Sequence, residues 1–115
     1  MDQICLLMPV LPGRVDDARD FMDELDRDRS TEYDRSEQRI GIDKEVWFLA
    51  SAPHDVSLVA YIEAADFARA LEQFSASEDE FDRWFKSRLR EVTGIDLNDP
   101  PAMTLPELLS AYSAT

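Results

Sequence analysis

The sequence predicts an α+β domain in which the elements follow the order β-α-β-β-α-β. Three observations support this order. Residues 42–63 alternate in character on both sides of a turn, as a β-hairpin does, and residues 3–11 are apolar on both faces of an extended strand. Segments with apolar residues at helical spacing lie on either side of the hairpin. At 115 residues and 44% hydrophobic content, the chain is expected to form one domain over residues 1–115 with a substantial core.

The hairpin has a predicted register. Pro53, His54 and Asp55 supply the turn, and a symmetric three-residue loop fixes which residues face each other. One face then pairs Val46 with Ile62, Phe48 with Ala60 and Ala50 with Leu58, and is predicted to be core. The other face pairs Leu49 with Val59, Trp47 with Tyr61 and Glu45 with Glu63, and is aromatic and half-polar. On this register Phe48 is buried, and its replacement by Ala should cost about 3–5 kcal/mol.

The elements before the hairpin are a strand and a helix. Residues 3–11 predict a strand covered on both sides and therefore central in the sheet, with Pro9 near its end. A helix is expected to begin near Arg14 or Val15 and to continue beyond Leu25 into the charged segment 26–39. Its apolar stripe consists of Val15, Ala18, Met22 and Leu25, with Tyr33 as an anchor further along. Gly41 closes the segment as a helix-ending or a bulge residue.

Two helical segments follow the hairpin. Asp66 is predicted to cap the first, and Ser77 with Glu80 forms a capping-box pattern for the second, which ends at Gly94. The apolar stripes comprise Phe67, Ala70, Leu71 and Phe74, then Phe81, Trp84, Phe85, Leu89 and Val92; this spacing is typical of core packing rather than of a cofactor site.

Residues 98–115 are expected to form a C-terminal extension. The local sequence favours a helix there, whereas completion of the sheet favours a strand. Thr104 and Glu107 with Pro106 favour a short helix. The two-sided apolar first strand needs a second neighbour in the sheet, and residues 104–112 could supply it as a last strand. The strand is the prediction, with the helix as its alternative.

Composition excludes several classes of function. The net charge is −13, with 12 basic and 25 acidic residues interleaved, so no nucleic-acid partner is expected. No apolar run approaches the length of a membrane span, the start lacks the features of a signal peptide, and Cys5 is the single cysteine, which together favour the cytoplasm. With one His and one Cys, neither a metal site nor a cofactor is expected.

The element order, the acidic first helix and the strands containing Trp47-Phe48-Leu49 and Tyr61-Ile62-Glu63 resemble the dimeric α/β-barrel superfamily of ferredoxin-like proteins. Within it, the chain resembles a small bacterial family of unknown function. The resemblance implies a homodimer that packs the open sheet faces together, with a cleft between sheet and helices or between sheets. Members include cofactor-free monooxygenases, haem-handling proteins, small-ring isomerases and ligand sensors, so the fold does not choose a function. The haem-handling members use a ligating histidine near the pocket, whereas His54 is placed on the hairpin turn.

The candidate site lies on the half-polar hairpin face. Glu45, Glu63 and Tyr61 are candidates for acid–base chemistry, because the two facing carboxyls beside Tyr61 can share a proton. Trp47, Tyr61, Leu49 and Val59 are candidates for binding a small apolar or aromatic ligand, or for the dimer interface. Alternatively the glutamates sit in water at the strand ends.

Three functional classes therefore remain open. The preferred one is a dimeric small-ligand-binding or structural module. The second is a small acid–base or oxygenase-type enzyme that uses the cleft. The third is an interaction protein whose acidic first helix, through Asp16, Asp20, Asp23 and Glu24, binds a basic partner.

Overall fold

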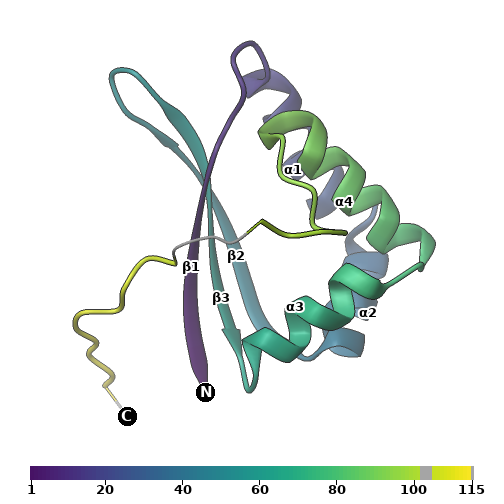
Figure 1. Cartoon of the computed structure of the whole chain (residues 1–115), viewed down its shortest axis with the longest axis vertical. Helices are drawn as coiled ribbons and strands as arrows, with labels where there is room; N and C mark the ends of the chain where they lie inside the picture. The colour runs from purple at the N-terminus through teal and green to yellow at the C-terminus, as the bar shows by residue number, and fades with distance from the viewer. Residues whose placement is uncertain (102–104, 115) are drawn as a thin grey trace.

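The computed structural model describes residues 1–101 and 105–114 and has an α+β fold (Figure 1). Within these residues, a three-stranded antiparallel sheet in the order β1-β3-β2 is covered on one side by four helices. The elements are β1 (Asp2–Pro9), α1 (Val15–Asp26), α2 (Ser30–Ile40), β2 (Ile42–Ser51), β3 (Val56–Ala64), α3 (Phe67–Ala76) and α4 (Glu80–Thr93). The predicted α+β ferredoxin-like class is confirmed.

The position of β1 in the sheet differs from the prediction. β1 pairs only with β3 among the described residues and is an edge strand, while β3 is the central strand. The apolar character of both faces of β1 has another origin. Met8 is buried against the helices, whereas Leu7, on the opposite face, is 58% exposed. One face of β1 therefore belongs to the core and the other is an apolar surface.

The hairpin register is shifted by one residue from the predicted one. Val46 lies opposite Tyr61, and Phe48 lies opposite Val59. The cause is the loop, because Ser51 already pairs with Val56 and the turn therefore contains four residues rather than three. It is closed by a hydrogen bond from Ala52 N to Asp55 O of 2.8 Å. A one-residue shift turns every side chain of one strand to the other face.

This shift reverses the predicted faces of β2 and leaves those of β3 as predicted. Leu58, Ala60 and Ile62 of β3 are buried beneath the helices. On β2, Trp47 is the residue that points to the helices, where its ring centroid lies 6.0 Å from that of Phe85. Phe48 is 57% exposed on the opposite face, so the prediction that Phe48 is a core residue was wrong.

The charged segment after α1 is a second helix. α1 ends at Asp26, residues 27–29 form a turn, and α2 runs from Ser30 to Ile40. The continuous helix expected past Leu25 is therefore divided in two. Gly41 ends α2 as predicted: its φ of 89° lies in the left-handed region that glycine adopts without steric cost, and β2 begins at the next residue.

Of the two helices after the hairpin, α3 begins at the predicted cap and α4 does not. Asp66 caps α3 by accepting a hydrogen bond from Arg69 N, as expected. The cap of α4 is Asp79, whose side chain accepts from Phe81 N, and not Ser77. The capping box was wrong because its two side chains bind elsewhere: the Ser77 hydroxyl donates to Asp82, and the Glu80 carboxylate pairs with Arg29.

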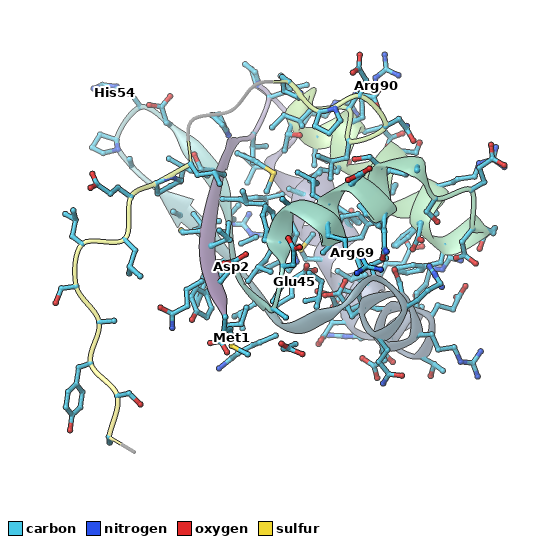
Figure 2. The ribbon with its side chains drawn as sticks, turned by 60° about the horizontal axis from the view of Figure 1, so that its bottom comes forward. Met1, Asp2, Glu45, His54, Arg69 and Arg90 are labelled. Atoms are coloured by element: carbon cyan, nitrogen blue, oxygen red, sulfur yellow. The ribbon has the colours of Figure 1, made fainter. Side chains whose placement is uncertain are left out.

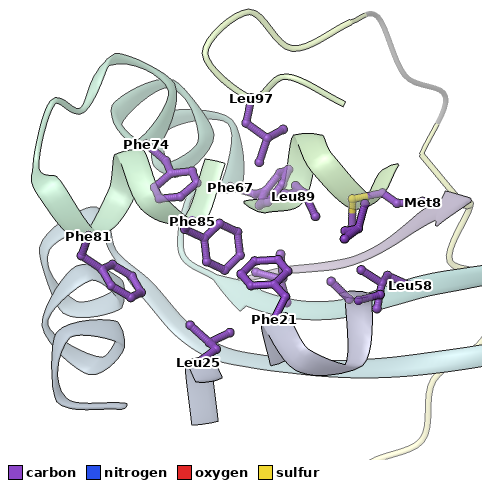
Figure 3. Packing of buried hydrophobic residues seen from close by; sticks show 14 of the residues in the cluster. Met8, Phe21, Leu25, Leu58, Phe67, Phe74, Phe81, Phe85, Leu89 and Leu97 are labelled. Atoms are coloured by element: carbon purple, nitrogen blue, oxygen red, sulfur yellow. The ribbon is translucent and has the colours of Figure 1, made fainter. Parts of the chain in front are cut away.

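The core fills the space between the sheet and the helices (Figure 3). Phe21 of α1 is fully buried and makes edge-on contacts with Trp84 and Phe85 of α4. The predicted aromatic stripe of α4 is therefore core. Leu97, in the loop after α4, closes one end of the cluster.

The C-terminal extension is neither a fourth strand nor a helix over residues 105–112, so both predictions for these residues were wrong; Thr104 lies outside the described residues. Figure 1 and Figure 2 both show the extension beyond β1, on the side away from the helices. Leu108, Leu109 and Tyr112 are 60%, 84% and 92% exposed. The apolar pattern that favoured an ordered element is present, but these side chains have little contact with the body of the chain.

Candidate functional site

Four polar and aromatic side chains meet between α2 and β2, and we call them the carboxyl cluster: Tyr33, Glu37, Glu45 and Trp47. Tyr33 and Glu37 are four residues apart and share one face of α2. Glu45 and Trp47 are two residues apart and share the helix-facing side of β2. The turn at Gly41 folds these two faces onto each other.

Hydrogen bonds converge on one oxygen of Glu45. The Tyr33 hydroxyl donates to Glu45 Oε2 in a short contact, and Trp47 Nε1 donates to the same oxygen at 3.0 Å. Neither donor reaches Oε1. Glu37 Oε2 is buried and has no hydrogen-bond partner among the residues that the structure describes. Glu45 Oε2 is thus held by two donors, whereas Glu37 Oε2 has none.

Burial controls the protonation of the two glutamates. Desolvation, together with the neighbouring charge of Glu45, raises the pKa of Glu37 to about 10. Desolvation also raises the pKa of Glu45, while hydrogen bonds from Tyr33, Trp47 and Glu37 act in the opposite direction. The pair therefore keeps a proton at neutral pH, and the hydrogen bonds that Glu45 accepts favour its ionisation over that of Glu37. Burial, with the adjacent Glu45, also raises the pKa of the Tyr33 phenol.

The cluster forms the polar end of a cavity of about 180 Å³ between the sheet and the helices. The rest of the wall is mostly apolar and aromatic. It includes Leu6, Met8, Phe67, Ala70, Phe74, Phe81, Phe85 and Leu89, with Pro100, Pro101 and Leu105 of the C-terminal extension at one side. Figure 2 shows Glu45 between the sheet and the helices, far from His54 at the hairpin tip.

A second buried polar group lies behind the cavity and is structural. Asp82 of α4 is fully buried and accepts hydrogen bonds from Ser36 of α2 and from Ser77, each at 2.5 Å, and from Arg39. Lys86, 1% exposed, donates to the backbone oxygens at the end of α3, those of Phe74, Ser75 and Ser77, at 2.9–3.2 Å. These bonds fix α2, α3 and α4 around the cavity.

The candidate residues from the sequence are divided between the two faces of the sheet. Glu45, Trp47 and Leu49 face the helices, with Glu45 and Trp47 in the cavity wall. Val59, Tyr61 and Glu63 face the other way, because they alternate with the buried residues of β3. The predicted opposition of Glu45 and Glu63 was therefore wrong: Glu45 lies opposite Ile62, and Lys44 lies opposite Glu63.

The side of the sheet away from the helices, which we call the open face, carries its own tyrosine–glutamate pair. The Tyr61 hydroxyl donates to Glu63 Oε2 at 2.7 Å. This hydrogen bond raises the pKa of the Tyr61 phenol. The apolar residues of the open face are Cys5, Leu7, Val46, Phe48 and Val59.

His54 is exposed in the hairpin loop, and Cys5 is half-buried on the open face. Over residues 1–101 and 105–114, no group of three His, Cys, Asp or Glu side chains is placed to hold a metal ion. None of the helices in this same part of the chain is both long and apolar enough to span a bilayer.

Sequence reasoning missed Glu37 and gave Tyr33 only an anchoring role. The signal was present, because Tyr33, Ser36, Glu37 and Ile40 have the spacing of one helical face. A glutamate within such a stripe, one turn after a tyrosine, indicates a buried carboxyl. The dense charge of residues 26–39 concealed that stripe.

Comparison with known proteins supports the fold. No protein-family model and no curated protein matches the chain. Among solved structures, the chain is similar to tetracenomycin F2 cyclase from Streptomyces glaucescens, a type II polyketide cyclase, with 16% identity, full coverage of both chains and a TM-score of 0.56. The likeness places this chain in the same fold.

Proposed function

We propose that this chain binds a small, mainly apolar ligand with one aromatic ring in the cavity between its sheet and helices, and that the carboxyl cluster holds the polar group of that ligand. The observation that carries the proposal is the buried, unpartnered Glu37 Oε2 at the end of an otherwise apolar cavity. A buried polar atom without a partner is costly, and a ligand that hydrogen-bonds to it would remove that cost.

The size of the cavity limits the ligand. An apolar cavity of roughly 150 Å³ is known to hold benzene. A cavity of about 180 Å³ therefore suits a single aromatic ring with a few further atoms rather than a compound of several fused rings. The similar solved structure is titled as a polyketide cyclase, which agrees with an aromatic ligand class, although the present cavity favours a smaller member of it.

Titration with two matched probes tests this proposal. Indane and 2-indanone have the same ring system, and only 2-indanone offers a carbonyl oxygen to the carboxyl cluster. We expect both to bind, as followed by calorimetry or ligand-observed NMR, and 2-indanone to bind about tenfold more tightly, the equivalent of one hydrogen bond. Absence of binding by either probe would refute the proposal.

Replacement of two alanines of α3 by leucine, one at a time, locates the binding site. Ala70 is buried in the cavity wall, so Ala70→Leu should fill part of the cavity and abolish binding. Ala68 lies on the exposed side of the same helix, and Ala68→Leu adds the same atoms without entering the cavity. Equal binding by both variants would place the probes elsewhere.

We also propose that the chain forms a homodimer through the open face. Leu7 and Phe48 are more than half exposed there and are flanked by Val46 and Val59. A continuous apolar sheet face of this kind is typical of a protein–protein contact. The similar solved structure belongs to a dimeric fold, which supports the same arrangement.

The acidic-interaction function has less support. It requires α1 to present a surface of one charge sign, but Asp16 pairs with Arg19, Asp23 with Arg27, and Glu24 with Arg88. These partners divide the acidic surface, so it offers a basic partner no continuous contact.

A further inference from the structure

The carboxyl cluster contains more hydrogen-bonding capacity than the fold uses. Glu45 is held by two donors, Tyr33 and Trp47, and both bind its Oε2. Its Oε1 is left to Glu37 or to a ligand. Glu37 has its own buried oxygen without a partner. Glu37 Oε2 therefore has no partner at the polar end of the cavity, and Glu45 Oε1 is bound by neither Tyr33 nor Trp47.

The two carboxyls have different protonation states. Glu45 accepts hydrogen bonds from a phenol and an indole, which stabilise a carboxylate. Glu37 receives no such bond from the described residues and sits beside that negative charge, so the shared proton belongs to Glu37. The cluster thus presents a base and an acid side by side.

Building on the proposed ligand binding, we infer that the cavity catalyses proton transfer at the carbon next to the carbonyl group of a small aromatic ketone or enone, with Glu45 as the base and Glu37 as the acid. A protonated carboxyl in an apolar site can donate to a developing enolate oxygen, and a carboxylate in the same site can remove the carbon-bound proton.

The step balances within the chain and the substrate. Glu45 Oε1 takes the proton as the C–H bond breaks, and that electron pair forms the C=C bond of the enol. Glu37 gives its O–H proton to the carbonyl oxygen. In the second half, Glu45 either returns that proton to the far carbon of a conjugated system, or exchanges it with solvent water and delivers a solvent proton to the original carbon, while Glu37 recovers its proton from the enol hydroxyl. The net change is exchange or isomerisation, and neither an oxidant nor a cofactor is consumed.

The apolar wall supports this chemistry. Phe67, Phe74, Phe81 and Phe85 exclude water from the reacting atoms, and electrostatic interactions are stronger in such surroundings. Tyr33 and Trp47 are positioning residues, since they hold the Glu45 carboxylate and do not reach the oxygen that takes the proton.

Deuterium exchange of 2-indanone tests the inference. In D₂O, the purified full chain should replace the protons beside the carbonyl at a rate about 10²-fold or more above that in the same buffer without protein. Loss of the ¹H NMR signal gives the rate, and the binding titration of the same compound is recorded in parallel. Binding with exchange at the buffer rate would overturn this inference and leave the proposed ligand binding intact. No binding would overturn the ligand binding itself.

Three substitutions assign the roles. Glu45→Gln should return exchange to the buffer rate while the affinity for 2-indanone changes less than tenfold. Glu37→Gln serves as the second variant if Glu45→Gln does not fold, and should also abolish exchange, because an amide donates a hydrogen bond but not its proton. Glu63→Gln, on the open face beside Tyr61, should exchange as the unaltered chain does. Full exchange activity in Glu45→Gln or Glu37→Gln would refute its assigned role.

The positioning role of Tyr33 has a separate readout. Two titratable neighbours, Tyr33 and Glu37, affect the pKa of Glu45. Three acidic neighbours, Glu45, Asp82 and Asp34, affect the pKa of Glu37. Tyr33→Phe removes a bond that favours the Glu45 carboxylate, so the pH at which exchange reaches half its maximum should move upward. A loss of rate without that movement would mean that Tyr33 acts only in packing.

Discussion

At the scale of single residues, this protein places ionisable side chains where burial changes their behaviour. Glu37 and Glu45 share a site that an apolar core would not need, and Lys86 is fully enclosed at the end of α3. The carboxyl pair keeps one unsatisfied oxygen, Glu37 Oε2, whereas Lys86 has three hydrogen-bond acceptors. The first arrangement costs stability and is typical of function, and the second is typical of structure.

The protonation of Glu37 predicts how stability depends on pH. Its folded-state pKa of about 10 lies above the ordinary value of 4.5, so between these values the folded chain holds a proton that the unfolded chain has released. The contribution of Glu37 to the free energy of unfolding is therefore complete below about pH 4.5 and is lost as the pH rises towards 10. Glu37→Gln mimics the protonated form and should reduce the loss of stability between about pH 5 and about pH 9.

Urea unfolding across this range measures the effect. Glu72→Gln removes a glutamate from the exposed side of α3 and serves as the control, with a pH dependence like that of the unaltered chain. If Glu37→Gln and Glu72→Gln behave alike, Glu37 is ionised in the folded protein.

Lys86 predicts a loss of stability of a different kind. Lys86→Met keeps the length of the side chain but leaves the carbonyls of Phe74, Ser75 and Ser77 without their donor, at a cost of about 1–3 kcal/mol or more. Arg83→Met, on the exposed side of the same helix, should change the free energy of unfolding by less than about 0.5 kcal/mol. A similar, small effect of both substitutions in denaturant titrations would show that Lys86 reaches solvent.

At the scale of elements, the connections determine where the site forms. The junction between α2 and β2 brings Tyr33 and Glu37 over Glu45 and Trp47, and it does so within one residue, Gly41. The four-residue loop of the hairpin determines which side of β2 faces the helices. Neither connection contributes a side chain to the cavity, yet each decides what the cavity contains.

Gly41 is the element boundary that can be tested directly. No atom lies within 4 Å of a side-chain carbon added there, so a substitution is opposed only by the positive φ of 89°. Gly41→Ala should therefore destabilise the chain by about 1–2 kcal/mol, and Gly41→Asn, which tolerates this conformation better, by less. Equal stability of Gly41→Ala and the unaltered chain in thermal unfolding would mean that the helix does not end in this conformation.

The sequence predicted the elements better than their connections. Periodicity located β1, the hairpin, α3 and α4, because burial of one face imposes a regular spacing on each. It could not distinguish a loop of three residues from one of four, and that difference reversed β2 and separated Glu45 from Glu63. Glu45 and Trp47, two of the candidate residues, line the cavity, but on the face of the sheet opposite to the predicted one. Glu37 was missed because the dense charge of residues 26–39 obscures the helical stripe to which it belongs.

At the scale of the whole molecule, the chain is covered on one side and open on the other. All four helices lie against one face of the sheet (Figure 1). Exposed apolar and aromatic side chains lie on the open face, at Leu7 and Phe48, and in the C-terminal extension, at Leu108, Leu109 and Tyr112. The extension is also unusual in charge: residues 100–115 contain Glu107 as their one charged residue, although charged residues make up 32% of the chain. A highly charged protein that leaves these two regions apolar is expected to bury them by association.

Sedimentation tests the association that we propose. The unaltered chain should sediment at about twice 13.2 kDa at micromolar concentration, and Phe48→Asp, which places a charge on the open face, should shift it to 13.2 kDa. Ala68→Asp adds the same charge on the helical side and should leave the mass unchanged. A 13.2 kDa species for the unaltered chain would refute the dimer.

The length of the loop between β2 and β3 affects how the binding specificity of such a protein can evolve. Removal of one codon from residues 52–55 would restore the three-residue turn and rotate β2 by one position, which would send Phe48 inward and Glu45 outward. A single in-frame deletion would thus exchange the contents of the cavity and of the contact surface without altering any residue in either. Random point substitution would need several simultaneous changes to reach the same result, so short insertions and deletions at the hairpin tip are the efficient route between binding specificities on this scaffold.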